Sequence, residues 1–528
     1  MPLIKNPLRS IPFYPFLLGL FPVLSLLGHN AEELQLVEGL RSIVLVLLLT
    51  ALLLLLARAF LRTWDRAAIW TSIVVLGLLS YGHLYHALRS ALPFGNLIVR
   101  HRYLASALLL AAIGFTLWIR RRSNLAGLRP ALNSIALLLL VLPGFQIIRA
   151  GLESSRSAGQ TAAVPASCRF AIPAGETPPD IYYVILDAYA RNDVMQRTYD
   201  FDNQPFLDAL QARGFYVTEW AQSNYARTGI SLESSLNMSY FDLTSDQPVL
   251  GEQEHYSKEL SIGNNVMRQE LKCLGYQVVA FDSGYYWSGW RDADVFLSPV
   301  ESAGGFQLLE RVNPFESLLL YNSAGLLALD ASTLWLRGFQ DVVNEPMALH
   351  RERVVFALKQ TGEFVPKLDS PKFVFVHVVS PHPPFVLGFE NEAAGGQGPF
   401  TFETLSEYGR GISEVEGYRT QVLALNERVL AMVDGILAQS RTPPVIILQG
   451  DHGTGSGVKD RMSIFSAYYL PGDGPQELYP TITPINGVRV VFQRYFTGDL
   501  PLLEDHTYFS EYDSLFDLTE VPNPYAGP

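Results

Sequence analysis

Five apolar stretches occupy the first 150 residues, and they constrain the fold of this chain more than any other feature. Each approaches the ~20 apolar residues that a helix needs to cross the hydrocarbon core of a bilayer. The third is the least regular, because Tyr and His residues gather near its end. The sequence therefore predicts an N-terminal polytopic α-helical membrane domain over residues 1–150. The stretches cover about 11–28, 40–60, 67–88, 103–119 and 131–148.

The charge of the chain divides at the same place. Residues 1–150 contain one Lys and 13 Arg against four acidic residues, a net charge of +10. The whole chain carries −12, so the remainder carries about −22. Nucleic acid is an unsuitable partner for so acidic a part, since phosphate binding needs clustered Lys and Arg.

Loop charge predicts the orientation of the spans. Basic residues gather before the first stretch, between the second and third, and between the fourth and fifth, and such loops stay in the cytoplasm. Five spans then place the chain after about residue 150 outside the cytoplasmic membrane, although the basic loop 89–102 argues against this orientation. The first stretch lacks a small-residue cleavage site, which predicts a retained anchor and not a removed signal peptide.

Alternating strands and helices are predicted after a linker. Residues 151–179 are rich in Ser, Ala, Gly and Pro, a linker composition. Over 180–528, buried strand patterns alternate with amphipathic helix patterns, which predicts a three-layer α/β domain with a mainly parallel sheet. Strands are expected at 180–186, 215–218, 276–281, 373–379 and 445–448, and helices at 203–213, 229–239, 262–273 and about 411–438.

Two other features allow more than one interpretation. Residues 315–338 are apolar and helical, which favours a packed core helix, with a face resting on the bilayer as the alternative. Cys168 and Cys273 both follow the membrane part. They would form a disulfide in an oxidising compartment, but two free buried thiols fit the sequence as well.

The segment Gly450-Asp451-His452-Gly453 carries the strongest chemical information. It follows the apolar strand 445–448, and in open α/β sheets ligands bind at the carboxyl ends of the strands. An adjacent carboxylate and imidazole suit a hard or borderline metal ion. Asp187 ends the first strand in the same way, as a metal ligand or, in the simpler interpretation, as a helix N-cap.

Two further residues have the chemistry that such a site needs. Thr228 opens a predicted helix, where free N–H groups favour an oxyanion and a nearby cation would activate the hydroxyl as a nucleophile. An ordinary Thr N-cap is the alternative. His382 lies between prolines in a loop that leaves a strand, either aimed at a substrate oxygen or simply at the surface. His377, inside that strand, is interpreted as a packed core residue.

Trp290 and Arg291 form a candidate substrate contact. They follow the strand that ends at Phe281, together with Trp287. Aromatic rings and an Arg fork suit a phosphorylated head group. A hydrophobic cluster explains the tryptophans equally well.

Together these motifs resemble the alkaline-phosphatase/sulfatase superfamily. Asp187, Thr228, His382 and the Asp451-His452-Gly453 motif occur in its order, and the layout is similar to that of lipoteichoic acid synthases and phosphoethanolamine transferases. The resemblance implies that Asp187, Thr228, Asp451 and His452 bind one divalent metal ion, either manganese, magnesium or zinc. It further implies that Thr228 is the nucleophile and that His382 contacts the phosphate or leaving oxygen.

The chain departs from this superfamily at two positions. Lipoteichoic acid synthases have Glu where this chain has Asp187, which leaves the metal preference open. Sulfatases carry a Cys or Ser that becomes formylglycine, whereas this chain has Thr228, which disfavours sulfate-ester hydrolysis.

The expected function is a metal-dependent phosphotransferase anchored in the bacterial cytoplasmic membrane, with its catalytic domain outside. It would move a phospholipid-derived head group of the phosphoglycerol or phosphoethanolamine type, through a phospho-Thr intermediate, to an envelope glycan, lipid or polymer. The alternatives are a phosphodiesterase, phosphatase or sulfatase-like hydrolase with the same site, and an inactive membrane sensor or scaffold.

Overall fold

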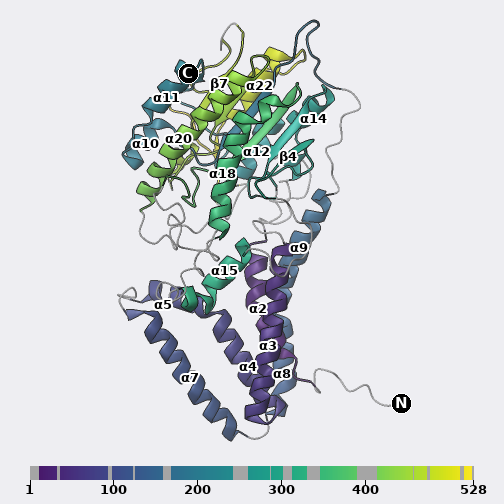
Figure 1. Cartoon of the computed structure of the whole chain (residues 1–528), viewed down its shortest axis with the longest axis vertical. Coiled ribbons are helices and arrows are strands. Elements are labelled where there is room, and N and C mark those ends of the chain that lie inside the picture. The colour runs from purple at the N-terminus through teal and green to yellow at the C-terminus, as the bar shows by residue number, and fades with distance from the viewer. Residues whose placement is uncertain are drawn as a thin grey trace, which may run out of the picture. The chain divides into compact units, whose positions relative to one another are not determined.

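The chain forms two compact units, one helical and one α/β (Figure 1). The helical unit comprises described residues within Met1–Ser155 and Ala303–Pro346. The α/β unit comprises those within Arg156–Ser302, Met347–Gln397 and Phe402–Pro528. The computed structural model describes residues 11–31, 36–92, 98–122, 125–158, 168–241, 260–285, 287–300, 312–329, 345–388, 413–455, 457–472, 476–511 and 517–525.

The apolar stretches of the N-terminal part form the helices of the first unit. Helices α2, α3 and α4 pack against one another, and α8 packs against α2. Small side chains allow the close approach, since a Cβ on Gly19 of α2 would lie 2.8 Å from Thr50 Oγ1 of α3. The helices are α2 (Tyr14–His29), α3 (Gly39–Leu61), α4 (Trp64–Leu79), α5 (Tyr81–Ala91), α7 (His101–Arg121), α8 (Arg129–Leu139) and α9 (Val141–Ala158).

The helices qualify as membrane spans to different degrees. Three described segments are long and apolar enough to cross a membrane, namely Leu36–Leu61, His101–Arg121 and Ala126–Arg149. Helices α4 and α5 are bent by 57° and make a fourth if they count as one span. Helix α2 is apolar but has only 16 residues, which at 1.5 Å per residue is shorter than the ~30 Å hydrocarbon core. The expectation of five spans is therefore supported for three or four of them.

Helix α15 (Pro314–Asn322) belongs to the helical unit although it lies far along the chain. Its Phe315 is buried in a cluster with Val23, Val46 and other residues of α2, α3 and α4. Glu316 forms an ion pair with Arg41 of α3 and completes a capping box at the start of α15. The helix expected at 315–338 is thus packed, but against the apolar N-terminal helices, and residues 330–338 lie outside the described part of the chain.

A seven-stranded sheet forms the centre of the α/β unit, in the order β2-β7-β6-β1-β5-β3-β4. The five strands from β6 to β4 are parallel, and β7 runs antiparallel to β6 and to β2. Every residue of the central strand β1 is buried, as its unbroken apolar sequence requires. The strands are β1 (Ile181–Leu186), β2 (Tyr216–Val217), β3 (Gln277–Phe281), β4 (Val295–Leu297), β5 (Lys372–Val378), β6 (Val445–Gln449) and β7 (Ser466–Tyr469).

Helices cover both faces of this sheet (Figure 1). One face joins α12 (Thr228–Asn237), α14 (Val266–Cys273) and α22 (Pro484–Tyr495) in a single hydrophobic cluster. On the other face, Phe281 of β3 contacts Phe356 of α18 (Glu345–Glu363). Helix α18 in turn packs on α20 (Glu414–Gln439), where Gly362 lies against the backbone of Met432. The predicted three-layer α/β architecture with a mainly parallel sheet is confirmed.

A disulfide joins Cys168 to Cys273, at the end of α14. The two cysteines are 105 residues apart in the sequence. Closing so long a loop removes conformational entropy from the unfolded chain. The sequence left open whether these cysteines pair, and the structure contains the disulfide.

A buried ion pair holds the amino ends of three central strands. Lys372 Nζ of β5 lies 2.6 Å from Asp180 Oδ2, just before β1, and both side chains are buried. The backbone N–H of Val445, at the start of β6, donates to the Asp180 carbonyl. These contacts set the register of β1, β5 and β6, whose opposite ends carry the candidate site.

We predict that Lys372→Met lowers the free energy of unfolding by about 3–5 kcal/mol, because it leaves the Asp180 carboxylate buried and unpaired. Chemical denaturation of the detergent-solubilised chain, followed by tyrosine and tryptophan fluorescence, measures this. Lys359→Met is the matched control, since Lys359 forms an exposed pair with Glu363 on α18 and should change little. An unchanged midpoint for Lys372→Met would contradict the assignment.

Candidate metal centre and nucleophile

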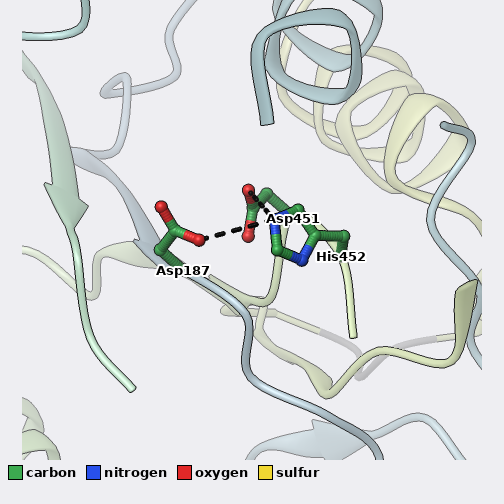
Figure 2. Close-up of side chains that lie close together, drawn as sticks. All are labelled: Asp187, Asp451 and His452. Atoms are coloured by element: carbon green, nitrogen blue, oxygen red, sulfur yellow. Dashed lines mark ion pairs between the residues drawn. The ribbon is translucent and has the colours of Figure 1, made fainter. Parts of the chain in front are cut away.

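Three buried ligand groups meet at the carboxyl edge of the sheet. Asp187 follows β1, and Asp451 and His452 follow the neighbouring strand β6. One ligand atom from each lies within 4.8 Å of the others (Figure 2). His452 Nε2 is 3.6 Å from Asp187 Oδ1 and 3.5 Å from Asp451 Oδ2. The structure therefore brings together three of the four ligands predicted from the sequence, and the fourth, Thr228, adjoins them.

The polar atoms of this group fit a cation. Both carboxylate oxygens of Asp187, and Oδ2 of Asp451, are buried and accept no hydrogen bond from the described residues. Burying such charges is costly unless a positive charge compensates them. His452 Nδ1 lies 2.8 Å from the Gly453 carbonyl, which can only accept, so Nδ1 carries the proton and Nε2 offers its lone pair. Two carboxylates, an imidazole and a hydroxyl suit a divalent ion.

The electrostatics of the site separate the two carboxyl groups. Burial alone would raise the pKa of Asp187, but the charge of His382, and next the His377 imidazole beside it, hold that pKa well below its usual range. Burial, and next the Asp187 charge, raise the pKa of Asp451. Burial, and next Arg461, hold the pKa of His452 well below its ordinary value. His452 is thus the neutral imidazole that metal binding requires.

Thr228 is the first residue of α12 and faces this group. Its Oγ1 lies 3.1 Å from His452 Nε2, and the residue is half-buried. The first N–H groups of a helix have no intrahelical acceptor and favour an anion nearby. Ser231, one turn further on, donates from Oγ to the Asp451 carbonyl at 2.7 Å and so ties α12 to the loop after β6. A hydroxyl, a helix N-terminus and a cation site therefore coincide.

His382 lies beside the group in the loop after β5. Its backbone N–H donates to the Asp187 carbonyl at 2.9 Å, and its ring centroid is 6.3 Å from that of His452. Gln421 of α20 donates to the carbonyls of Pro381 and His382 and holds this loop. The placement is compatible with the role that the resemblance implies for His382.

Trp290 and Arg291 are not brought to this group. Trp290 is 3% exposed, stacks on Phe375 with ring centroids 4.2 Å apart and belongs to the core cluster. Arg291 is exposed, and its guanidinium lies over Phe296 at 5.9 Å. The hydrophobic-cluster interpretation therefore describes Trp290, and the expected substrate contact by these two residues has no geometric support.

Sequence reasoning missed His377 as a neighbour of the ligands. It is buried in β5 as expected, but its Nε2 lies 3.3 Å from Asp187 Oδ2 and its Nδ1 lies 2.8 Å from Ser288 Oγ. The rings of Tyr285 and Trp287 lie beside it, with centroids 6.0 and 5.9 Å away. The signal available in the sequence was a lone ionisable residue inside an otherwise apolar strand, since buried polar groups need partners.

A second residue that the sequence did not reveal is Arg461, in the short helix α21 (Val458–Met462). Its Nη2 lies 3.0 Å from His452 Nε2, and its Nε donates to the Ala226 carbonyl at 2.9 Å. No motif marked this residue, because only the fold brings it to the group.

Comparisons with known proteins give structural matches only. No family model matches the sequence, and no curated protein matches it. The chain is similar to the C-terminal periplasmic domain of EcEptC from Escherichia coli in complex with Zn, at 13% identity and a TM-score of 0.40, over 68% of this chain and 96% of that one. It is also similar to the integral membrane protein lipooligosaccharide phosphoethanolamine transferase A from Neisseria meningitidis, at 12% identity and a TM-score of 0.37, over 91% and 95% of the two chains.

A third similar structure is a 2-O GAG sulfatase, at 13% identity and a TM-score of 0.34, over 63% of this chain and 77% of that one. Phosphoethanolamine transferases and sulfatases, the proteins that the sequence resembles, are thus both among the similar structures.

We predict that the wild-type chain binds about one divalent ion and that Asp451→Asn with His452→Ala lowers its affinity at least ~100-fold, because two ligands are lost. Manganese titration calorimetry of the metal-stripped, detergent-solubilised chain measures this. Affinity should rise with pH, since the raised pKa of Asp451 means that a proton must leave before the metal binds. His506→Ala, which removes a half-buried imidazole paired with Glu520, is the control. Equal affinity in the double variant would refute the assigned ligands.

We also predict that His377→Phe lowers manganese affinity by about 10- to 100-fold with the fold intact, because Asp187 loses the ring that orients its carboxylate. Ser288→Ala removes only the partner of the other ring nitrogen and should have a smaller effect. Calorimetry measures both variants, with far-UV circular dichroism to verify folding. If His377→Phe binds manganese as tightly as wild type, His377 is only a packing residue.

Proposed function

We propose that this chain is a membrane-anchored, metal-dependent phosphotransferase that takes a phosphoglycerol- or phosphoethanolamine-type head group from a phospholipid. The observation that supports it most is the Thr228 hydroxyl at the start of α12, 3.1 Å from His452 of the buried Asp187–Asp451–His452 group. A nucleophile, a helix N-terminus and a cation site together suit phosphoryl transfer, which needs positioning and charge neutralisation more than elaborate acid–base chemistry.

In this proposal Asp187, Asp451, His452 and Thr228 hold one divalent ion. The ion would supply a lowered pKa for the Thr228 hydroxyl and neutralise charge on the phosphoryl oxygens. The N–H groups that open α12 receive the remaining oxygens. His382, whose backbone is fixed to Asp187, faces the leaving oxygen and gives it a proton.

The reaction then has two balanced steps. Thr228 Oγ loses its proton and forms a bond to phosphorus, and the bond from phosphorus to the diacylglycerol oxygen breaks. His382 gives that oxygen a proton, and the proton from Thr228 replaces it on His382. An acceptor hydroxyl on an envelope glycan, lipid or polymer then attacks the phospho-Thr adduct. The Oγ–phosphorus bond breaks and the proton of the acceptor returns to Thr228.

The apolar helices of the N-terminal unit support the membrane part of the proposal. They confine the catalytic unit to the bilayer that contains the donor lipid. We count five spans, namely α2, α3, the bent pair α4–α5, α7 and the segment Ala126–Arg149. With the basic loops in the cytoplasm, five spans place the α/β unit outside the bacterial cytoplasmic membrane. The disulfide between Cys168 and Cys273 agrees with that oxidising side.

Hydrolysis by the same site is the second candidate, with water in place of the acceptor. An inactive sensor or scaffold would not need to keep unpaired buried carboxylates beside a nucleophile, since such groups destabilise the fold.

We predict that Thr228→Ala lowers the release of diacylglycerol roughly 10⁴-fold or more, while Thr228→Ser keeps a measurable rate because a hydroxyl remains. Detergent-purified protein is incubated with head-group-labelled phospholipids and manganese, and diacylglycerol and intact protein mass are followed. The adduct mass identifies the head group, and its loss on adding an acceptor separates transfer from hydrolysis. Metal-loaded wild type that releases no diacylglycerol from any phospholipid would exclude the lipid-donor function.

A further inference from the structure

Arg461 is a cation whose charge the neighbouring groups do not balance. Among the described residues it forms no ion pair within 4.0 Å, and the contacts of its guanidinium are the Ala226 carbonyl and the His452 ring. The two site carboxylates belong to the group that fits a divalent ion, and their charge would be balanced by that ion. Arg461 then remains as a positive charge in excess, which favours an anionic ligand.

The geometry aims this charge at the nucleophile. The Nε of Arg461 is fixed to the carbonyl of Ala226, two residues before Thr228. Its Nη2 lies 3.0 Å from the same His452 Nε2 that lies 3.1 Å from Thr228 Oγ1. The backbone of Arg461 also accepts from the Gly453 N–H, so the residue is held to the metal-binding loop at both ends.

Arg461 is positively charged and partly exposed to solvent. An arginine guanidinium stays protonated at neutral pH, so Arg461 brings a positive charge to the site. The residue is half-buried, so part of it is accessible to a bound molecule. A sealed structural arginine would offer no such access.

Metal binding would change what Arg461 contacts. If His452 holds the ion through Nε2, the lone pair that Arg461 Nη2 now faces would be occupied, and the Arg461 N–H would need another acceptor. A tetrahedral oxyanion bonded or about to be bonded to Thr228 supplies oxygens there, and a planar guanidinium fork suits such oxygens.

From this arrangement we propose that Arg461 is a substrate-contacting catalytic residue that donates to the oxygens of the phosphoryl group transferred to Thr228. The inference rests on the proposed phosphotransferase function. It adds Arg461 to the N–H groups of α12 as a second group that binds the phosphoryl oxygens. It also predicts that the site binds free inorganic phosphate once the metal is present.

The test compares Arg461→Met, which keeps the stem and removes the charge, with Lys459→Met, a matched control two residues away on an exposed position of α21. Titration calorimetry on the full detergent-solubilised chain measures manganese affinity first, and then the affinity of the manganese-loaded protein for inorganic phosphate. We expect Arg461→Met to weaken phosphate about 10- to 100-fold, the loss of a charge-assisted hydrogen bond. Lys459→Met should bind phosphate as wild type does.

Manganese affinity separates a substrate contact from a structural role. Removing a positive charge beside the ion should leave manganese affinity unchanged or increase it, whereas a residue needed only to shape the loop would lower it. Arg461→Lys keeps the charge without the fork and should lie between wild type and Arg461→Met for phosphate. Guanidinium ion added to Arg461→Ala should partly restore phosphate binding.

The proposal is overturned if manganese-loaded Arg461→Met binds phosphate within twofold of wild type, or if the Met and Lys variants both lose manganese affinity in parallel with phosphate. It is also overturned if manganese-loaded wild type binds no phosphate. Phosphate binding that depends on Arg461, in a protein that releases no diacylglycerol, would support Arg461 as an oxyanion contact and reject only the lipid donor.

Discussion

Two carboxylates forced together at the end of neighbouring strands are the constraint on which the rest of the site depends. In the parallel pairing of β1 with β6, Ile185 lies opposite Gln449. Asp187 and Asp451 each follow two residues later, so the register of the sheet brings both acids to the same level. Their burial makes this placement unfavourable unless a cation shares it. The sheet therefore creates the need for a metal ion as well as the site that satisfies it.

One helix holds both the loop that follows Asp187 and the loop that carries His382. Ala188, directly after Asp187, has a left-handed backbone with φ 60°, an unfavourable conformation for a residue with a side chain. That conformation accompanies a hydrogen bond from the Ala188 N–H to Asp451 Oδ1 at 3.0 Å. The Tyr418 hydroxyl of α20 donates to the Ala188 carbonyl, and Gln421, one turn along, holds the His382 loop. Helix α20 thus positions both loops through buried hydrogen bonds, which explains how the strained residue persists.

The sequence was most informative where an apolar run ends in a polar residue. The strands before Asp187 and Asp451 are continuous and buried, so their boundaries and the chemistry after them could be predicted together. The helix that Thr228 opens and the long helix α20 also matched their patterns closely. Strands β4 and β7 were missed because they are short edge or antiparallel elements with weak patterns.

Contacts between distant segments could not be predicted in the same way. Arg461 and His377 reach the site only through tertiary packing and strand register, since His377 lies opposite Ile185 in β5. The sequence could not separate a substrate contact from packing at Trp290, because a tryptophan beside an arginine has the same sequence whether it binds a ligand or packs on Phe375, as it does here. The packing of α15 on the apolar N-terminal helices was likewise invisible, because an apolar helix gives no indication of its partner.

The position of α15 in the chain shows how the α/β unit is connected to the apolar N-terminal helices. After β4 the chain leaves the α/β unit, packs Phe315 among the apolar N-terminal helices and pairs Glu316 with Arg41, and then returns at α18. Helix α18 carries Arg353, whose Nε lies 3.0 Å from Asp282 at the end of β3. The segment after β3 carries Ser288, whose Oγ lies 2.8 Å from His377 Nδ1 of β5. The chain therefore connects the α/β unit to the helical unit at several points of the sequence. In the proposed function, a site linked to the bilayer would meet its lipid donor at a high effective concentration. Modest intrinsic affinity for the donor would then suffice, and the site could be shaped for the transferred phosphoryl group instead of for the acyl chains.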